Sequence, residues 1–246
     1  MTVCGGWSLV RETDRTREAI TMFCRSWACA DCMPYRLASL KRLARSGQPS
    51  TFLTLTVNPL RGQSPENRAQ ELTDALKIMM KRARRKWTKA PIEYLAVFEE
   101  TKQGEPHLHL LMRAPFVPQK WLSEQMNELI EAPIVDIRHV HAAAGAARYV
   151  AKYVAKGPKG FGSLKRYWCT PKYDLDETRK AEKKARGKSG WMICKDDLET
   201  IWQDWARAGF AIDLEEENCV LAGRTEQDVD RLRGHRNLEK KQRHRA

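Results

Sequence analysis

The sequence has no long apolar stretch. None of its apolar runs approaches the ~20 residues that a membrane-spanning helix needs. Residues 1–14 also lack the apolar segment of a secretory signal peptide. No glycine-rich P-loop and no internal repeat occur. These absences argue against a membrane partner, export and a repeat architecture, so we expect a cytoplasmic protein.

Acidic residues are few compared with basic ones. The chain has 44 Lys and Arg against 31 Asp and Glu, a formal net charge of +13. The natural partner is an acidic polymer, either nucleic acid or an anionic membrane surface. Nucleic acid fits better because an apolar anchor is missing. In the basic run of residues 81–86, Arg84 and Arg85 are candidates for contacts with phosphates.

Cysteines are clustered and odd in number. Of seven, four lie in the first 32 residues. Without an export signal, such a cluster more often binds metal than forms disulfides. Thiolates can hold one tetrahedral Zn²⁺, and the candidate ligands are Cys4, Cys24, Cys29 and Cys32. We expect a structural zinc site that ties an N-terminal arm to the core; the alternative is buried cysteines without metal.

Residues 48–156 alternate between strand and helix patterns. Strands are predicted at 51–57, 93–100, 106–112 and 134–140, and helices from 64–65 onward, at 118–131 and at 142–156. This is a βαββαβ order followed by a helix, which predicts an α+β, ferredoxin-like or RRM-like core with a central antiparallel sheet. The first and third strands usually lie in the middle of such a sheet.

Two histidines, His107 and His109, fall on the third predicted strand. Residues two apart in a strand share a face. A hairpin loop at 102–106 would place Glu99 opposite His109 and on the same face; a slip of one residue would bring Glu100 there instead. Two imidazoles and a carboxylate can hold Mg²⁺ or Mn²⁺ and leave positions open for substrate.

A histidine pair on a strand can also be an ordinary surface feature. His139 and His141 form a second such pair near the end of the fourth predicted strand, without an acidic partner. We assign that pair a structural or phosphate-contacting role.

Two tyrosines, Tyr149 and Tyr153, lie one helical turn apart in YVAKYVAK, and Lys152 and Lys156 repeat the same step. A phenol with an ordinary pKa near 10 needs help to attack a phosphate. Metal polarisation of the phosphate and nearby lysine charge both provide it. The alternative is a helix whose tyrosines pack on a sheet.

The strand FLTLT, the pattern E-x7-H-L-H and YVAKYVAK together resemble the three motifs of HUH rolling-circle replication initiators. The resemblance covers residues 51–156 and is closest to the two-tyrosine class of small single-stranded DNA phages, including microviruses, and related plasmids. One departure is Gln103, where relatives often have a basic residue before the glycine.

The resemblance implies a metal-dependent endonuclease that nicks single-stranded origin DNA and later religates it. His107, His109 and Glu99 would bind Mg²⁺ or Mn²⁺, and Tyr149 and Tyr153 would be nucleophiles that form a 5′-phosphotyrosine. Lys152 would position phosphate or metal-bound water. A host helicase would unwind the DNA, in a bacterial cytoplasm if a phage or plasmid encodes the chain.

From these patterns we expect four regions. They are a cysteine zinc segment at 1–48, an HUH core at 49–160, an accessory region at 161–220 and a flexible basic tail at 221–246. In the basic, aromatic loop that ends at residue 168, Arg166 and Trp168 are candidates for DNA contacts.

Two other functions fit the same sequence. A two-tyrosine single-strand transposase would use the same chemistry in another DNA neighbourhood. A non-catalytic, zinc-stabilised nucleic-acid binder on an RRM-like sheet would need stacking aromatics on its first and third strands. Those strands offer only Phe52.

Overall fold

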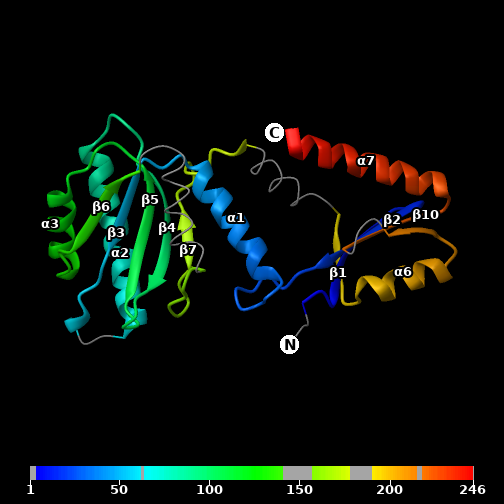
Figure 1. The fold of residues 1–246 in the computed structure, drawn as a ribbon, viewed down its shortest axis with the longest axis horizontal. Coiled ribbons are helices and arrows are strands. Elements are labelled where there is room, and N and C mark those ends of the chain that lie inside the picture. Colours follow the sequence, from blue (N-terminus) through cyan, green and yellow to red (C-terminus); the bar gives the residue numbers. More distant parts are fainter. Residues whose placement is uncertain (1–3, 62–63, 141–156, 178–189, 215–217, 246) are drawn as a thin grey trace. The chain divides into compact units, whose positions relative to one another are not determined.

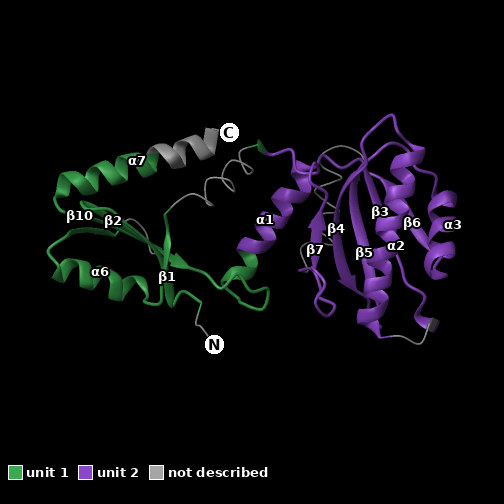
Figure 2. Ribbon diagram, turned by 180° about the vertical axis from the view of Figure 1, so that it is seen from behind, with its two compact units in different colours: residues 1–34, 177–246 green, residues 35–176 purple. Residues whose placement is uncertain are grey.

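The structure is a computed structural model that describes residues 4–61, 64–140, 157–177, 190–214 and 218–245 (Figure 1). The chain divides into two compact units (Figure 2). Unit 1 combines residues Met1–Pro34 and Glu177–Ala246, and unit 2 is Tyr35–Asp176. None of the helices in the described part has the length and apolar character that a membrane crossing requires.

Unit 2 contains the predicted strands and helices between residues 51 and 140. Helix α1 crosses the boundary into this unit and was not predicted. The elements, in chain order, are α1 (Cys32–Ser46), β3 (Thr51–Leu55), the short η1 (Pro59–Arg61), α2 (Pro65–Lys86), β4 (Glu93–Glu100), β5 (Pro106–Arg113), α3 (Gln119–Ile130), β6 (Val135–His139) and β7 (Tyr167–Cys169). The helix predicted at 142–156 lies outside the described residues.

The sheet of unit 2 has the order β6-β3-β5-β4-β7, with antiparallel neighbours. Strands β3 and β5 are therefore interior, as predicted for the first and third strands of this segment. Strand β7 extends the sheet beyond β4 and was not predicted. A strand of three residues carries too little alternation to be recognised in a sequence.

Helices α2 and α3 cover one face of this sheet. Helix α2 begins where the sequence predicts, because the Ser64 hydroxyl accepts a hydrogen bond from Asn67 N–H and Pro65 occupies the first turn. Its apolar stripe packs with the inward side chains of the strands into one core that includes Leu53, Leu72, Met79, Phe98, Leu110 and Met126. The opposite face carries the histidines of β5.

Unit 1 is built on a second antiparallel sheet, which the sequence did not reveal. Its strand order is β8-β1-β2-β10-β9. The bounds are β1 (Trp7–Glu12), β2 (Thr16–Met22), β8 (Met192–Cys194), β9 (Ala211–Leu214) and β10 (Cys219–Gly223). Helix α6 (Leu198–Arg207), predicted from its apolar spacing, packs Ile201 and Trp205 against Ala19 and Val220.

The end of the chain differs from the predicted flexible tail. Residues Glu226–Arg245 form helix α7. Thr225 starts the helix, since its hydroxyl accepts a hydrogen bond from Asp228 N–H. Val229 and Leu232 pack with Leu221 of β10, on the sheet face opposite Val220. Two apolar contacts on a strongly charged helix are too sparse a pattern to identify from sequence, but they dock its first half.

Candidate metal centre and sheet face

The histidines lie on the interior strand β5, and their partner on β4 differs from the predicted one. Glu99 is opposite His107, and Val97 is opposite His109. The loop therefore comprises residues 101–105, closed by a hydrogen bond from Thr101 N–H to the Glu105 carbonyl (2.9 Å). The predicted pairing of Glu99 with His109 was wrong by two residues. A shift of two keeps every side chain on its face, so Glu99 still projects with the histidines.

Glu99 and the two histidines meet on this face. His109 Nε2 is 2.6 Å from Glu99 Oε2. The rings of His107 and His109 are edge to face, with centroids 6.1 Å apart. Glu100, the alternative third ligand, instead forms an ion pair with Lys159 (3.1 Å). The structure thus brings together the three residues chosen from the sequence.

Thr54 completes the surroundings of His109, and sequence reasoning missed it. It lies directly opposite His109 on β3, and its Oγ1 is 3.0 Å from His109 Nδ1. Phe52 stacks on the same ring at a centroid distance of 5.4 Å. The signal was available, because Thr54 and Phe52 alternate along β3 toward the face of the histidines.

Electrostatics favour neutral imidazole at His107. Burial lowers the pKa of His107, the nearby His109 lowers it further, and Glu99 opposes the shift. A neutral imidazole is the form that binds metal. A divalent ion would replace the His109–Glu99 hydrogen bond, and His109 could keep Thr54 as the partner of its other nitrogen.

The donor set fits a divalent ion, but its three side chains are not yet closed around one point. Within the described residues, the four cysteines are the one group of three or more potential ligands whose donor atoms lie that close together. At least one side chain of Glu99, His107 and His109 would therefore change rotamer on binding.

The predicted nucleophiles and their lysines fall outside this geometry. Tyr149, Lys152, Tyr153 and Lys156 lie outside the described residues. His141 does so as well. His139 lies at the end of β6, opposite Thr51, and is exposed. Thr51 alternates with Phe52 and Thr54, so His139 belongs to the face that carries the helices.

The predicted DNA contacts of the loop before β7 are divided between the faces. Trp168 lies opposite Ala96 and packs against Phe98 of the core, with centroids 5.6 Å apart. Tyr167, opposite Val97, is on the histidine face instead. Arg166 is exposed, and its guanidinium donates a hydrogen bond to the Pro158 carbonyl (3.0 Å).

Arg84 and Arg85 lie on α2, over the other face of the sheet. Arg84 donates a hydrogen bond to the Ile92 carbonyl (2.9 Å), and Arg85 is exposed. The structure therefore does not bring these arginines together with the histidines.

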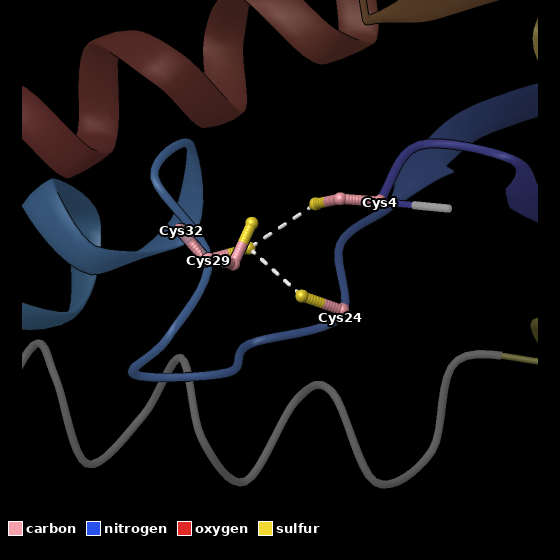
Figure 3. A group of neighbouring side chains, drawn as sticks. All are labelled: Cys4, Cys24, Cys29 and Cys32. Atoms are coloured by element: carbon pink, nitrogen blue, oxygen red, sulfur yellow. Dashed lines mark hydrogen bonds between the residues drawn. The ribbon is translucent and has the colours of Figure 1, made fainter. Parts of the chain in front are cut away.

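The four predicted zinc ligands do come together, in unit 1. Their sulfur atoms lie within 4.8 Å of one another, contributed by the chain before β1, the loop after β2 and the start of α1 (Figure 3). Cys32 Sγ is 3.3 Å from Cys4 Sγ and 3.7 Å from Cys24 Sγ. Tetrahedral Zn²⁺ with Zn–S bonds of about 2.3 Å places its sulfurs about 3.8 Å apart. The cluster therefore fits zinc after small adjustments.

The thiols of this cluster influence one another strongly. A backbone hydrogen bond from Cys24 acts to lower the pKa of Cys4, but hydrogen bonds with Cys32 and other thiols, together with burial, raise it to about 12. The pKa of Cys29 is lowered, chiefly by the backbone N–H of Cys32. Four thiolates so close together require a cation to offset their charge.

Comparison with known proteins adds one match. No curated protein and no solved structure matches the chain significantly. Residues 50–158 match the family model of the replication-associated protein ORF2. The matched segment contains β3, β4 and β5 and thus the face built by Thr54, Glu99, His107 and His109. This match supports a rolling-circle replication initiator family for the chain.

Proposed function

We propose that this protein starts rolling-circle replication by nicking single-stranded origin DNA, as an HUH endonuclease of the two-tyrosine kind with a ferredoxin-like core. The observation that carries the proposal is the meeting of Glu99, His107 and His109 on the middle of a sheet, within the segment that matches a replication-associated family. The same segment includes Tyr149 and Tyr153.

Glu99, His107 and His109 are the residues that would hold Mg²⁺ or Mn²⁺. The ion acts as a Lewis acid on the scissile phosphodiester. Two imidazole nitrogens among three donors favour Mn²⁺ over Mg²⁺, since Mg²⁺ prefers oxygen ligands. Thr54 fixes the ring of His109, and Lys152 holds the phosphate in place for attack.

Tyr149 or Tyr153 then supplies the nucleophile. The phenolic oxygen bonds to phosphorus and loses its proton, and the bond from phosphorus to the 3′-oxygen breaks. The leaving oxygen takes up a proton to become a 3′-hydroxyl, while the 5′ end stays on the tyrosine as a phosphodiester. Because one diester is exchanged for another, a free 3′-hydroxyl can reverse the step and religate the strand. The second tyrosine allows a second transfer while the first still holds an end.

The non-catalytic alternative is less well supported. An RRM-like binder needs an aromatic ring that is open to bases on the interior strands. Phe52 is 2% exposed and stacks on His109 instead. The transposase alternative shares the chemistry and would differ only in its DNA target.

Formation of a covalent protein–DNA adduct tests the proposal. Labelled single-stranded oligonucleotides tiled across the DNA that encodes the protein are incubated with it and Mn²⁺, and denaturing gels detect label that stays on the protein. We expect an adduct with one tile, dependent on the metal. The Tyr149→Phe/Tyr153→Phe variant should form none, and Tyr35→Phe, at an exposed tyrosine of α1, should react as the wild type does. An adduct that persists in the double variant would refute the assignment of the nucleophiles.

A further inference from the structure

A groove of about 700 Å³ lies in unit 2, away from the histidines. Its wall is the C-terminal part of α1, and residues 175–176 close its other side. The lining includes Lys41, Arg42 and Arg45 against one acid, Asp176. Nothing in the site described above uses this groove.

The groove is held rigidly. Ser46 Oγ donates a hydrogen bond to Asp174 Oδ1 (2.6 Å), and Leu175 N–H donates to the Ser46 carbonyl (3.3 Å). The fully buried Tyr173 donates its hydroxyl hydrogen to the Ala44 carbonyl (2.8 Å). A Cβ on Gly47 would lie 2.0 Å from the Tyr173 ring, so only glycine fits there. The segment 173–176 is thus fastened to α1.

Arg113 connects this corner to the strand of the histidines. Its guanidinium donates hydrogen bonds to the carbonyls of Gly47 (2.6 Å) and Lys172 (2.6 Å). It stands at the end of β5, four residues after His109 and on the same face. At about 3.4 Å per residue, His109 and Arg113 are ~14 Å apart along the strand. A DNA strand with its scissile phosphate near the histidines could extend to this corner.

The charges of the groove favour an anion. Arg42 is paired with Asp176 (2.8 Å), so Lys41 and Arg45 carry the uncompensated charge. Neither of these two has a carboxylate partner among the residues the structure describes. The C-terminal end of a helix repels anions. Here the Arg113 guanidinium, bonded to the Gly47 carbonyl just after α1, offsets that field.

We propose that the groove of Lys41 and Arg45 binds the phosphate backbone of the DNA strand that flanks the cleavage site. The inference rests on the proposed function for its ligand and identifies where the strand leaves the sheet. Lys41 and Arg45 lie one helical turn apart, so they can contact the same or neighbouring phosphates. Contacts of this kind position a strand without reading its sequence.

Anisotropy of fluorescent oligonucleotides, without added Mg²⁺ or Mn²⁺, tests the groove. The variant Lys41→Gln/Arg45→Gln should bind the adduct-forming tile about tenfold more weakly. Its log–log salt slope should fall by about 1.4, or about 0.7 for each lost contact with a single strand. On an oligonucleotide trimmed to a few nucleotides around the cleavage site, variant and wild type should bind alike.

A matched control separates the groove from net charge. Lys81→Gln/Arg85→Gln removes two exposed charges from α2, on the other face of the sheet. It should retain wild-type affinity within about twofold. The groove proposal is overturned if this control loses as much affinity as the groove variant, or if the groove variant binds the long oligonucleotide normally. Equal midpoints of thermal unfolding would show that the variants are folded.

The two proposals fail separately. At saturating DNA the groove variant should give wild-type adduct yield, because it leaves the chemistry intact. Wild-type protein that binds through the groove without forming an adduct would contradict the nickase proposal alone. Adduct formation with unchanged binding by the groove variant would contradict the groove alone.

Discussion

Thr54 controls which nitrogen of His109 is available to Glu99 and a metal ion. Its hydroxyl can accept a hydrogen from Nδ1, which leaves the Nε2 lone pair for the ion. A single hydroxyl on the neighbouring strand thus selects the tautomer that binds metal.

Replacing Thr54 tests this role. Thr54→Val keeps the shape and removes the hydroxyl, so we expect the Mn²⁺ concentration for half-maximal adduct formation to rise about 10–100-fold. Thr54→Ser should restore a value near that of the wild type. If Val and Ser variants respond alike, Thr54 serves packing and not the orientation of His109.

His107 makes stability depend on pH. Burial lowers its pKa in the folded state. Below the unfolded value of about 6.5, the unfolded chain therefore binds more protons at this site, and stability falls as the pH drops through the interval between the two values. We expect urea unfolding to show a larger loss from pH 7.5 to pH 5 for the wild type than for His107→Gln. Equal losses would contradict the shift.

At the scale of elements, hydrophobic periodicity predicted strands β3 to β6 and their order, but not the pairing of β4 with β5. Pairing depends on where the loop closes, and here Glu105 N–H donates to the Thr101 hydroxyl while Gly104 adopts a φ of +83°. These contacts fix the loop at 101–105. Charge patterns suggested Lys102 to Pro106, and nothing in the alternation of the strands distinguishes two loops that differ by an even shift.

The hairpin is also anchored from α2. Arg68, which is 6% exposed, makes two hydrogen bonds to the Glu105 carboxylate (2.7 and 2.6 Å). Removing one partner of a buried pair costs about 3–5 kcal/mol, and we expect the lower end for Arg68→Ala because Glu105 is partly exposed.

A matched variant on the same helix checks this difference. Arg82→Ala breaks an exposed pair with Glu128 (2.9 Å) and should cost less than about 1 kcal/mol. Urea unfolding measures both values. Similar costs for the two variants would show that the Arg68 pair does not anchor the hairpin.

At the scale of the whole molecule, the sequence indicated the cysteine cluster but not the sheet around it. Unit 1 joins residues from both ends of the chain, as in the pairing of β2 with β10. Such pairing across the whole chain leaves no local pattern. The cysteines were recognisable because three of them lie within nine residues, at Cys24, Cys29 and Cys32.

Removing zinc should therefore unfold unit 1 first. We expect purified protein to contain one zinc per chain by elemental analysis, and Cys24→Ser/Cys29→Ser to contain much less. The loss should lower a melting midpoint by on the order of 10 °C, since several kcal/mol of stabilisation would disappear. Cys194→Ser, outside the cluster, should keep both the zinc and the midpoint. Zinc retained by the double variant would contradict the assignment.

Binding of Mn²⁺, followed by electron paramagnetic resonance with the zinc left in place, tests most directly whether Glu99, His107 and His109 hold a divalent ion. The account predicts one tight Mn²⁺ per wild-type chain and affinities at least about tenfold weaker for Glu99→Gln and for His107→Ala, each folded. Unchanged Mn²⁺ binding in both variants would contradict it.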